Sequence, residues 1–358
     1  MRIFAVVSVA ALLVLGGCAT TKTLGPISAA DTRDQPPGPT NQHESFRDLK
    51  GWDQDDQSSA FEAYRATCQA LRDAASLQVC RRAMSVDLLD RSHARAFFED
   101  NFEVEAIPGT GILTAYFAPE YEARPKPNSE FSAPVRAKPG DLATDLRGAP
   151  KTPYPDRAWI ETQGSGEVLA WMRPEELFFL QIQGSGTLTF PGGRRVKALY
   201  AANNGRPFVG IANQMRDRGL LAGDNTSGDA IARWLAGHRG PEAQAIMWLN
   251  PRYVFFRLAP DDGLPPVGAA GLPLPAGRAV ALDLTHHTLG EVFWLDGTSP
   301  ILSGAFPQYR RLVMGLDTGG AIKGEVRADL YLGQGAQAGV EAGRVRHTLR
   351  LHRLVPRQ

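Results

Sequence analysis

Beyond residue 110 the chain is divided into short apolar runs that are separated by turns rich in glycine and proline. These turn residues are abundant, with 37 glycines and 26 prolines among 358 residues. Short strands at regular spacing are typical of barrels, whereas the strands of a parallel βαβ sheet alternate with long helices. The pattern therefore predicts a mainly β fold that contains a β-barrel. The runs cover residues 111–117, 158–160, 168–171, 177–182, 253–257, 278–283, 291–295, 311–317 and 327–332.

Helices are predicted in two places. In the first, aromatic and apolar residues recur at helical spacing and predict helices near 58–73 and near 85–103. In the second, start signals for short helices occur at Pro207, Ser227 and Pro241. The segment 119–157 is loaded with proline and charged residues and is predicted to be loop.

The N-terminus has the features of an export signal. Arg2 precedes an apolar stretch over 3–17, which is shorter than the ~20 residues that a membrane-spanning helix needs. Residues 1–17 are therefore predicted to be a signal peptide. The sequence LGGC at 15–18 matches the bacterial lipobox and predicts lipidation of Cys18, and the alternative is a plain secretory signal with a chance cysteine. Residues 18–50 are polar and rich in proline, which predicts a flexible tether.

The residue after the lipobox cysteine is Ala19, which is similar to Gram-negative lipoproteins of the outer membrane. We therefore expect an outer-membrane lipoprotein that faces the periplasm and contacts the membrane only through its lipid anchor. In that oxidising compartment Cys68 and Cys80 are the two remaining cysteines. Within one continuous helix they would lie about 18 Å apart, so a disulfide requires the helix to break near 73–76.

Charge and motif content exclude several functions. The formal net charge is +1, which argues against nucleic-acid binding. His286 and His287 are adjacent and would face opposite sides of a strand, and HExxH and CxxC motifs are absent from the sequence. We therefore predict no metal and no cofactor. The glycines at 268–271 lack the strand–helix context of a nucleotide site.

Three aspartates mark the candidate chemistry. Asp317 and Asp329 end or interrupt two predicted strands that flank a glycine-rich connection, and Asp283 ends a third strand. Asp329 and Tyr331 are predicted to point to one face of their strand, away from Leu330. An acid beside an apolar face has its pKa raised by desolvation, as a general acid requires. The alternative is that these aspartates merely end strands and cap turns.

The same segments resemble a known family. The sequence LDTGGAIKG at 316–324, with ADLY at 328–331, resembles the three-aspartate domain of membrane-bound lytic murein transglycosylase A. The resemblance extends over about 50–358, although Ala115 and Phe117 depart from the family's pattern and the connection before Asp329 is one residue longer. The upstream segments that share it are LTAYF at 113–117, FLQIQGSG at 179–186, YAANNG at 200–205 and NPRYVFF at 250–256.

This resemblance implies a double-psi β-barrel domain with a second, smaller β-barrel inserted in it and a glycan groove between them. It places the catalytic barrel at 51–116 and 257–358 and the insert at 117–256. It implies that Asp329 is the single catalytic acid and base, with Asp317 and Asp283 as supports in the cleft. The substrate-binding candidates are Thr114, Tyr116, Gln183, Gly184, Ser185, Asn203, Asn204 and Tyr331.

The implied reaction is the lytic cleavage of peptidoglycan with formation of 1,6-anhydromuramyl ends. The expected partners are glycan strands and proteins of cell-wall synthesis or division, and the chain is expected to be a monomer. One alternative is a β-1,4-glycan hydrolase of the same barrel type, which uses water as the nucleophile. The other is a lipoprotein that binds peptidoglycan without cleaving it.

Overall fold

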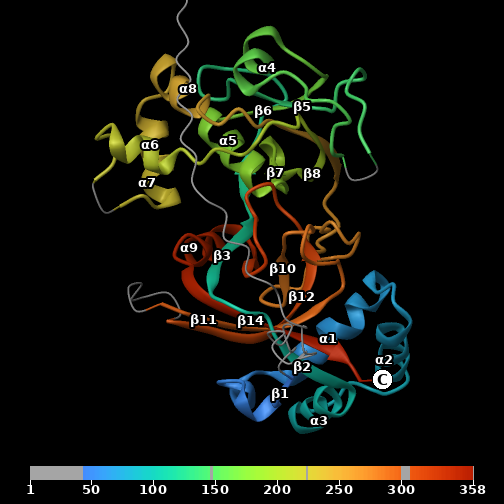
Figure 1. Ribbon diagram of the computed structural model, residues 1–358. Helices are drawn as coiled ribbons and strands as arrows, with labels where there is room; N and C mark the ends of the chain where they lie inside the picture. The colour runs from blue at the N-terminus through green and yellow to red at the C-terminus, as the bar shows by residue number, and fades with distance from the viewer. Residues whose placement is uncertain (1–42, 146–147, 223–224, 300–306, 358) are drawn as a thin grey trace, which may run out of the picture. The chain divides into compact units, whose positions relative to one another are not determined.

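The computed structural model describes residues 43–145, 148–222, 225–299 and 307–357, and the predicted signal peptide and Cys18 lie outside them. The prediction of a mainly β chain with some helices is confirmed (Figure 1). The strands are β1 His43–Glu44, β2 Phe102–Ala106, β3 Gly111–Ala118, β4 Glu120–Glu122, β5 Ala133–Arg136, β6 Val168–Met172, β7 Gly186–Thr189, β8 Arg195–Asn203, β9 Val254–Pro260, β10 Ala279–Ala281, β11 Val292–Thr298, β12 Gln308–Asp317, β13 Arg327–Gln334 and β14 Arg346–Pro356. The α-helices are α1 Gln57–Thr67, α2 Ala74–Met84, α3 Arg91–Asn101, α4 Arg157–Gln163, α5 Pro174–Gln183, α6 Ala212–Asp217, α7 Gly228–Gly237, α8 Pro241–Met247 and α9 Gly335–Ala342.

Six strands close into a barrel. They pair in the order β14-β11-β12-β10-β13-β3, and β3 pairs back to β14 to complete the ring. The pairs β10–β12 and β13–β3 are parallel, and the other pairs of the ring are antiparallel. The two short strands β2 and β1 extend the sheet from β14. The predicted barrel is thus confirmed, and closure leaves none of its six strands as an open edge.

The alternation of side chains gives the barrel two different faces. Leu113, Ala328 and Leu330 belong to a core that receives residues from all six strands and therefore fills the barrel. Tyr331, one position further along β13, belongs to a second core on the outer face. The predicted facing of Ala328 and Leu330 away from Tyr331 is confirmed.

Three helices cover part of the outer face. Buried aromatic residues of this segment, among them Trp52 and Phe61, share the outer core with Trp294 of β11. α1 ends at Thr67 and α2 begins only at Ala74, so the chain breaks in the way that pairing of its cysteines requires. The structure joins Cys68 and Cys80 in a disulfide with 5.7 Å between their Cα atoms.

The chain between β3 and β10 builds a second group of sheets. β4, β7, β8 and β9 form a four-stranded sheet, and β5 and β6 form a two-stranded one. An isolated bridge between Arg124 and Trp171 links the two sheets, and the Tyr253 hydroxyl donates to the Pro134 carbonyl 3.5 Å away. Residues of both sheets and of α5 share one hydrophobic core, so the two sheets pack together as the body of this part of the chain.

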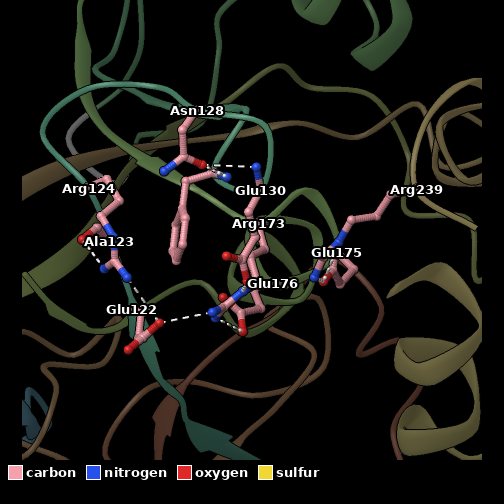
Figure 2. Close-up of polar contacts among 10 residues, drawn as sticks. Glu122, Ala123, Arg124, Asn128, Glu130, Arg173, Glu175, Glu176 and Arg239 are labelled. Carbon is pink, nitrogen blue, oxygen red and sulfur yellow. Dashed lines mark hydrogen bonds and ion pairs between the residues drawn. The ribbon is translucent and has the colours of Figure 1, made fainter. Parts of the chain in front are cut away.

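A cluster of charged side chains fastens the loop after β4 to the start of α5. Figure 2 shows Arg173 among acidic side chains, with donor–acceptor distances of 2.9 Å to Glu122, 2.6 Å to Glu130 and 3.0 Å to Glu176. The guanidinium carbon of Arg173 also lies 4.5 Å from the ring centre of the buried Phe131. Each nitrogen of this guanidinium is therefore used inside the fold.

Two predicted strands are wrong, because residues 158–160 lie in α4 and residues 177–182 lie in α5. In α4 the Asp156 carboxylate accepts the Trp159 N–H, and α5 begins at Pro174 with two glutamates in its first turn. Burial of α5 on several sides hides its helical period behind a continuous apolar run.

Several helix boundaries also differ from the sequence prediction. The predicted helix near 85–103 is the shorter α3, and α2 was not predicted. No helix begins at Pro207, since α6 starts at Ala212. The domain boundaries predicted after residues 116 and 256 fall inside β3 and β9.

Candidate active site

Two of the three aspartates lie in one row across the outer face of the barrel. Ala281 of β10 pairs with Asp317 of β12 on one side and with Asp329 of β13 on the other, and Asp329 pairs in turn with Thr114 of β3. The register of β10 and β12 shifts between Val280 and Ala281. A regular ladder would pair Ala281 with Leu316, and the shift pairs it with Asp317 instead. This irregularity therefore brings Asp317 into the row, as β-bulges do when they redirect a side chain.

Asp317 is held by three donors. Its Oδ2 accepts the Tyr116 hydroxyl at 2.8 Å, and its Oδ1 accepts the N–H groups of Ala269 at 3.0 Å and Thr318 at 2.9 Å. Burial raises the pKa of Asp317, and these hydrogen bonds only partly oppose that effect. Burial and the nearby Asp317 also raise the pKa of Tyr116, which keeps its hydroxyl protonated as the donor.

Asp329 is held by far fewer contacts. Its Oδ1 accepts the Thr114 hydroxyl, and its Oδ2 makes no hydrogen bond to any residue that the structure describes. Burial raises the pKa of Asp329, the Thr114 hydrogen bond and the Arg327 charge oppose the rise, and Asp317 adds to it. The site therefore favours a protonated carboxyl with one free oxygen, which suits a proton donor.

Asp283 lies outside the cavity, which corrects its predicted place in the cleft. Its buried carboxylate accepts the N–H of Gly324 at 2.8 Å and of Thr285 at 3.2 Å, and the Lys323 ammonium lies 3.5 Å away. Burial alone would raise the pKa of Asp283, but the hydrogen bonds and Lys323 lower it to about 2. Gly324 has a φ of 110°, which glycine adopts without strain. Asp283 therefore fixes the turn that ends the glycine-rich connection.

A cavity of about 310 Å³ opens over the row. Thr114, Tyr116, Asp317 and Asp329 line its barrel side. Its opposite wall comes from the insert, where Gln183 and Gly184 lie at the end of α5 rather than in the strand-end loop that we predicted. The Gln183 side-chain oxygen accepts the Phe117 N–H at 3.2 Å and so ties α5 to β3.

Four predicted binding residues do not line this cavity. Asn204 is buried, and its amide bonds the backbone of Pro155, Pro251 and Tyr253, so it holds loops together. Ser185 lies just beyond the cavity wall. Tyr331 is buried behind Tyr116, with 5.3 Å between their ring centres. Asn203 acts indirectly, since its side-chain oxygen accepts a hydrogen bond from Arg252, which lines the cavity.

Sequence reasoning missed all three arginines that line the cavity, Arg157, Arg252 and Arg327. The Arg327 Nη2 donates to the Thr114 hydroxyl at 2.8 Å and so orients the partner of Asp329. Because Arg327 precedes Asp329 by two residues on one strand, the same alternation that placed Tyr331 would have found it. Arg252 comes from the distant loop before β9 and donates to Asn203 at 3.2 Å. No spacing in the sequence connects Arg252 with the aspartates.

The histidine pair shows why neighbouring histidines need not bind metal. His287 is buried, with Nδ1 3.2 Å from a Glu291 carboxylate oxygen and Nε2 2.7 Å from the Glu325 carbonyl. His286 beside it is exposed. Among residues 43–145, 148–222, 225–299 and 307–357, no group of three or more metal-ligating side chains is gathered.

Known proteins share both halves of this arrangement. A family model described as the MltA specific insert domain matches residues 112–257, and one described as the 3D domain matches residues 278–355. A Vibrio cholerae protein named membrane-bound lytic murein transglycosylase A is 34% identical over 261 residues, which are 69% of this chain and 66% of that protein. The Escherichia coli K12 protein of the same name is 32% identical over 271 residues, 72% of this chain and 70% of its own length.

Solved structures give the same result. A membrane-bound lytic murein transglycosylase from Agrobacterium tumefaciens superimposes with a TM-score of 0.76 and 33% identity, covering 88% of this chain and 97% of that chain. Escherichia coli MltA with bound chitohexaose superimposes with a TM-score of 0.66 and 25% identity, covering 85% and 90%. The barrel, the insert and the paired aspartates thus define a lytic transglycosylase with a 3D domain.

The chain belongs to the membrane-bound lytic murein transglycosylase A family. It spans about two thirds of the length of the curated relatives that it matches. Although those relatives are named membrane-bound, no helix within the described part of this chain has the length and apolar content to cross a bilayer.

Proposed function

We propose that the chain cleaves the β-1,4 bond between N-acetylmuramic acid and N-acetylglucosamine as a lytic transglycosylase. Family membership supports the substrate class, since the curated relatives are named murein transglycosylases. The observation that carries the mechanism is the contrast between the two cavity aspartates. Among the described residues, Asp317 has three hydrogen-bond donors, whereas Asp329 has one and its second oxygen has none.

Asp329 acts first as the general acid. Its raised pKa favours the protonated carboxyl, which donates a proton to the glycosidic oxygen as the bond from that oxygen to C1 of the muramic acid breaks. The N-acetyl group of the muramic acid stabilises the positive charge that develops at C1, as in substrate-assisted glycosidases. The leaving sugar departs with the proton, and Asp329 is left as a carboxylate.

Asp329 then acts as the base. It takes the proton of the C6 hydroxyl of the same muramic acid while that oxygen bonds to C1. The product carries a 1,6-anhydro ring, the acid is regenerated and no water is consumed. One carboxyl is therefore sufficient, in contrast to the two that hydrolytic glycosidases use.

The residues around Asp329 have supporting roles in this proposal. Asp317 holds Tyr116 and raises the pKa of Asp329 by its nearby charge. Thr114, Tyr116, Gln183 and Gly184 contact the glycan from the two walls of the cavity. The solved Escherichia coli relative holds chitohexaose, a β-1,4 oligomer of N-acetylglucosamine, which is consistent with a glycan in this groove.

The remaining assignments rest on the resemblance. Residues 51–116 and 257–358 form the catalytic barrel, and residues 117–256 form the insert. Cys18 carries the lipid that anchors the chain to the outer membrane, facing the periplasm. The chain acts as a monomer alongside proteins of cell-wall synthesis or division.

The test of the mechanism replaces Asp329 by asparagine, which keeps the shape of the side chain and removes its proton transfer. We expect release of anhydromuropeptides from purified murein sacculi to fall by about 10²–10⁴-fold. The matched control is Asp217→Asn, because Asp217 is exposed and, among the residues that the structure describes, pairs only with its neighbour Arg216. Circular dichroism and thermal unfolding establish that both variants fold.

Mass spectrometry of the digest separates the alternatives, because an anhydro end is lighter by one water than a reducing end. Reducing ends from the wild-type protein would establish a hydrolase. Binding to sacculi without any soluble product would establish a non-catalytic binder. Near-normal anhydromuropeptide release by Asp329→Asn would overturn the assignment of the acid.

A further inference from the structure

Arg252 has hydrogen-bonding capacity that the fold does not use. Its Nη1 donates to the Asn203 side-chain oxygen at 3.2 Å and to the Arg206 carbonyl at 3.4 Å. Its Nε and Nη2 donate to no residue that the structure describes, and neither atom is sealed from solvent. No carboxylate of the described residues lies within ion-pair distance of this guanidinium. The Nε and Nη2 edge of the half-buried Arg252 guanidinium therefore has no hydrogen-bond partner among the described residues.

The unfilled guanidinium lies in the same cavity as the aspartates. The connection that follows Asp317 passes directly against it, since a Cβ atom built at Gly320 would lie 3.1 Å from the Arg252 Cζ. A larger residue at position 320 would require the arginine to move. The structure thus places a cation at a fixed position beside the loop that carries Asp317.

The other two arginines of the cavity use more of their nitrogens within the described residues, all three in Arg157 and two of three in Arg327. Arg157 donates to Glu161 at 3.0 Å and to the carbonyls of Asn250 and Arg252. Arg327 donates to Thr114 and to backbone carbonyls. Of the three, Arg252 is the one that retains a free pair of N–H groups for a ligand.

We propose that Arg252 binds a carboxylate on the lactyl side chain of N-acetylmuramic acid, an inference that rests on the proposed function. Neighbouring Nε–H and Nη2–H groups form a fork that matches the two oxygens of a carboxylate. Muramic acid differs from N-acetylglucosamine by its lactyl group, which ends in a free carboxylate or continues into a stem peptide that bears carboxylates. Recognition of that charge sets which of the two alternating sugars lies beside Asp329.

The electrostatics of the site agree with an anionic ligand. Burial lowers the pKa of Arg252, and Tyr200 opposes that effect only in part. A carboxylate bound at the free edge supplies a compensating negative charge. A neutral chitin-type strand can present hydroxyl and acetamide oxygens at this position but no negative charge.

The experiment measures binding by calorimetry in an Asp329→Asn background, which holds glycans without cutting them. The ligands are chitohexaose, a peptide-free strand of alternating N-acetylglucosamine and N-acetylmuramic acid, and the same strand with stem peptides. Arg252→Gln is expected to weaken binding of the peptide-free strand about 10- to 100-fold and to change chitohexaose binding less than about twofold. Arg252→Lys keeps the charge without the fork and is expected to fall between.

Two controls keep the test decisive. Arg218→Gln replaces an exposed arginine of the same insert and is expected to leave all three affinities unchanged. Amidation of the lactyl carboxylate removes the charge from the ligand instead of the protein, so it tests the intact pocket even when an Arg252 variant folds poorly. The amidated strand is expected to lose the same factor as the glutamine variant.

The two sources of the carboxylate give different results. A loss confined to the peptide-free strand identifies the lactyl carboxylate, and a loss that is larger on the substituted strand identifies the stem peptide. Equal weakening of chitohexaose and muramyl strands, or no weakening of either, overturns the proposal. If a wild-type digest contains no anhydro products, the proposed chemistry is wrong and the carboxylate site is not affected. If anhydro products form but Arg252→Gln keeps the preference for muramyl strands over chitohexaose, the carboxylate site is wrong and the chemistry is not affected.

Discussion

Arg173 and Arg252 belong to the same insert and are both partly buried, yet their surroundings are opposite. Arg173 meets three glutamates, which outweigh the effect of burial and raise its pKa (Figure 2). Arg252 meets an amide oxygen and a carbonyl, and burial lowers its pKa. Arg173 therefore connects parts of the fold, whereas Arg252 lies open to a cavity.

The two cavity aspartates repeat this contrast. Asp317 accepts three hydrogen bonds and is fixed by the fold, whereas Asp329 accepts one and keeps a free oxygen. Buried charged groups that serve structure are fully paired, because an unpaired one costs stability. A charged group that is left under-bonded beside a cavity is therefore the better candidate for chemistry.

The largest expected effect concerns the stability of the two arginine sites. Arg173→Gln removes three ion pairs and the contact with Phe131, so the free energy of unfolding is expected to fall by about 1–3 kcal/mol. Arg252→Gln is expected to change it by less than about 0.5 kcal/mol. Urea unfolding measures both, with Arg216→Gln as the control for an exposed pair. Equal losses of unfolding free energy in Arg173→Gln and Arg252→Gln would show that the two arginines contribute alike to stability, which would contradict the contrast drawn above.

A smaller effect separates the two aspartates. Asp317→Asn removes a negative charge that raises the pKa of Asp329, so fewer molecules carry the catalytic proton at neutral pH. We expect kcat/KM for anhydromuropeptide release to fall about tenfold and its alkaline limb to move to lower pH. The pH profile distinguishes this positioning role from a merely structural one, which would lower activity at every pH. Loss as severe as in Asp329→Asn, without a shifted limb, would contradict the division of roles.

The sequence predicted the fold and the candidate site better in the barrel than in the insert. Strict alternation in β13 placed Asp329 and Tyr331 opposite Leu330, because a strand fixes side-chain direction with period two. The row itself could not be derived, since Asp317 enters it through a register shift beside Ala281. Such a shift depends on how three strands pair and leaves no local signal.

The insert shows where local patterns fail. The apolar run at 177–182 was predicted to be a strand because a helix buried on several sides has no polar stripe to reveal its period. Asn204 was a binding candidate because it lies in a segment that resembles the family, but its amide bonds three backbone groups from distant loops. Arg252 escaped notice because the sequence does not state which arginines find carboxylate partners in the folded chain.

The smallest expected effect tests the under-bonded carboxyl through stability alone. Burial raises the pKa of Asp329 above that of an aspartate in the unfolded chain, so the folded state binds this proton more tightly. The stability that this group contributes is present below the unfolded pKa of about 3.9 and is lost as the pH rises through the folded pKa. Asparagine does not titrate and loses nothing over that range.

The melting temperature of Asp329→Asn is therefore expected to rise relative to wild type between pH 4 and pH 7, and Asp217→Asn is measured beside it as the exposed control. Thermal unfolding at several pH values measures this gap directly. A gap that stays constant would mean that Asp329 ionises as easily in the fold as outside it, and a gap that widens toward acid pH would mean that it ionises more easily in the fold. The surroundings would then stabilise the charged form of Asp329, and its free oxygen would no longer distinguish it from Asp317 as the acid.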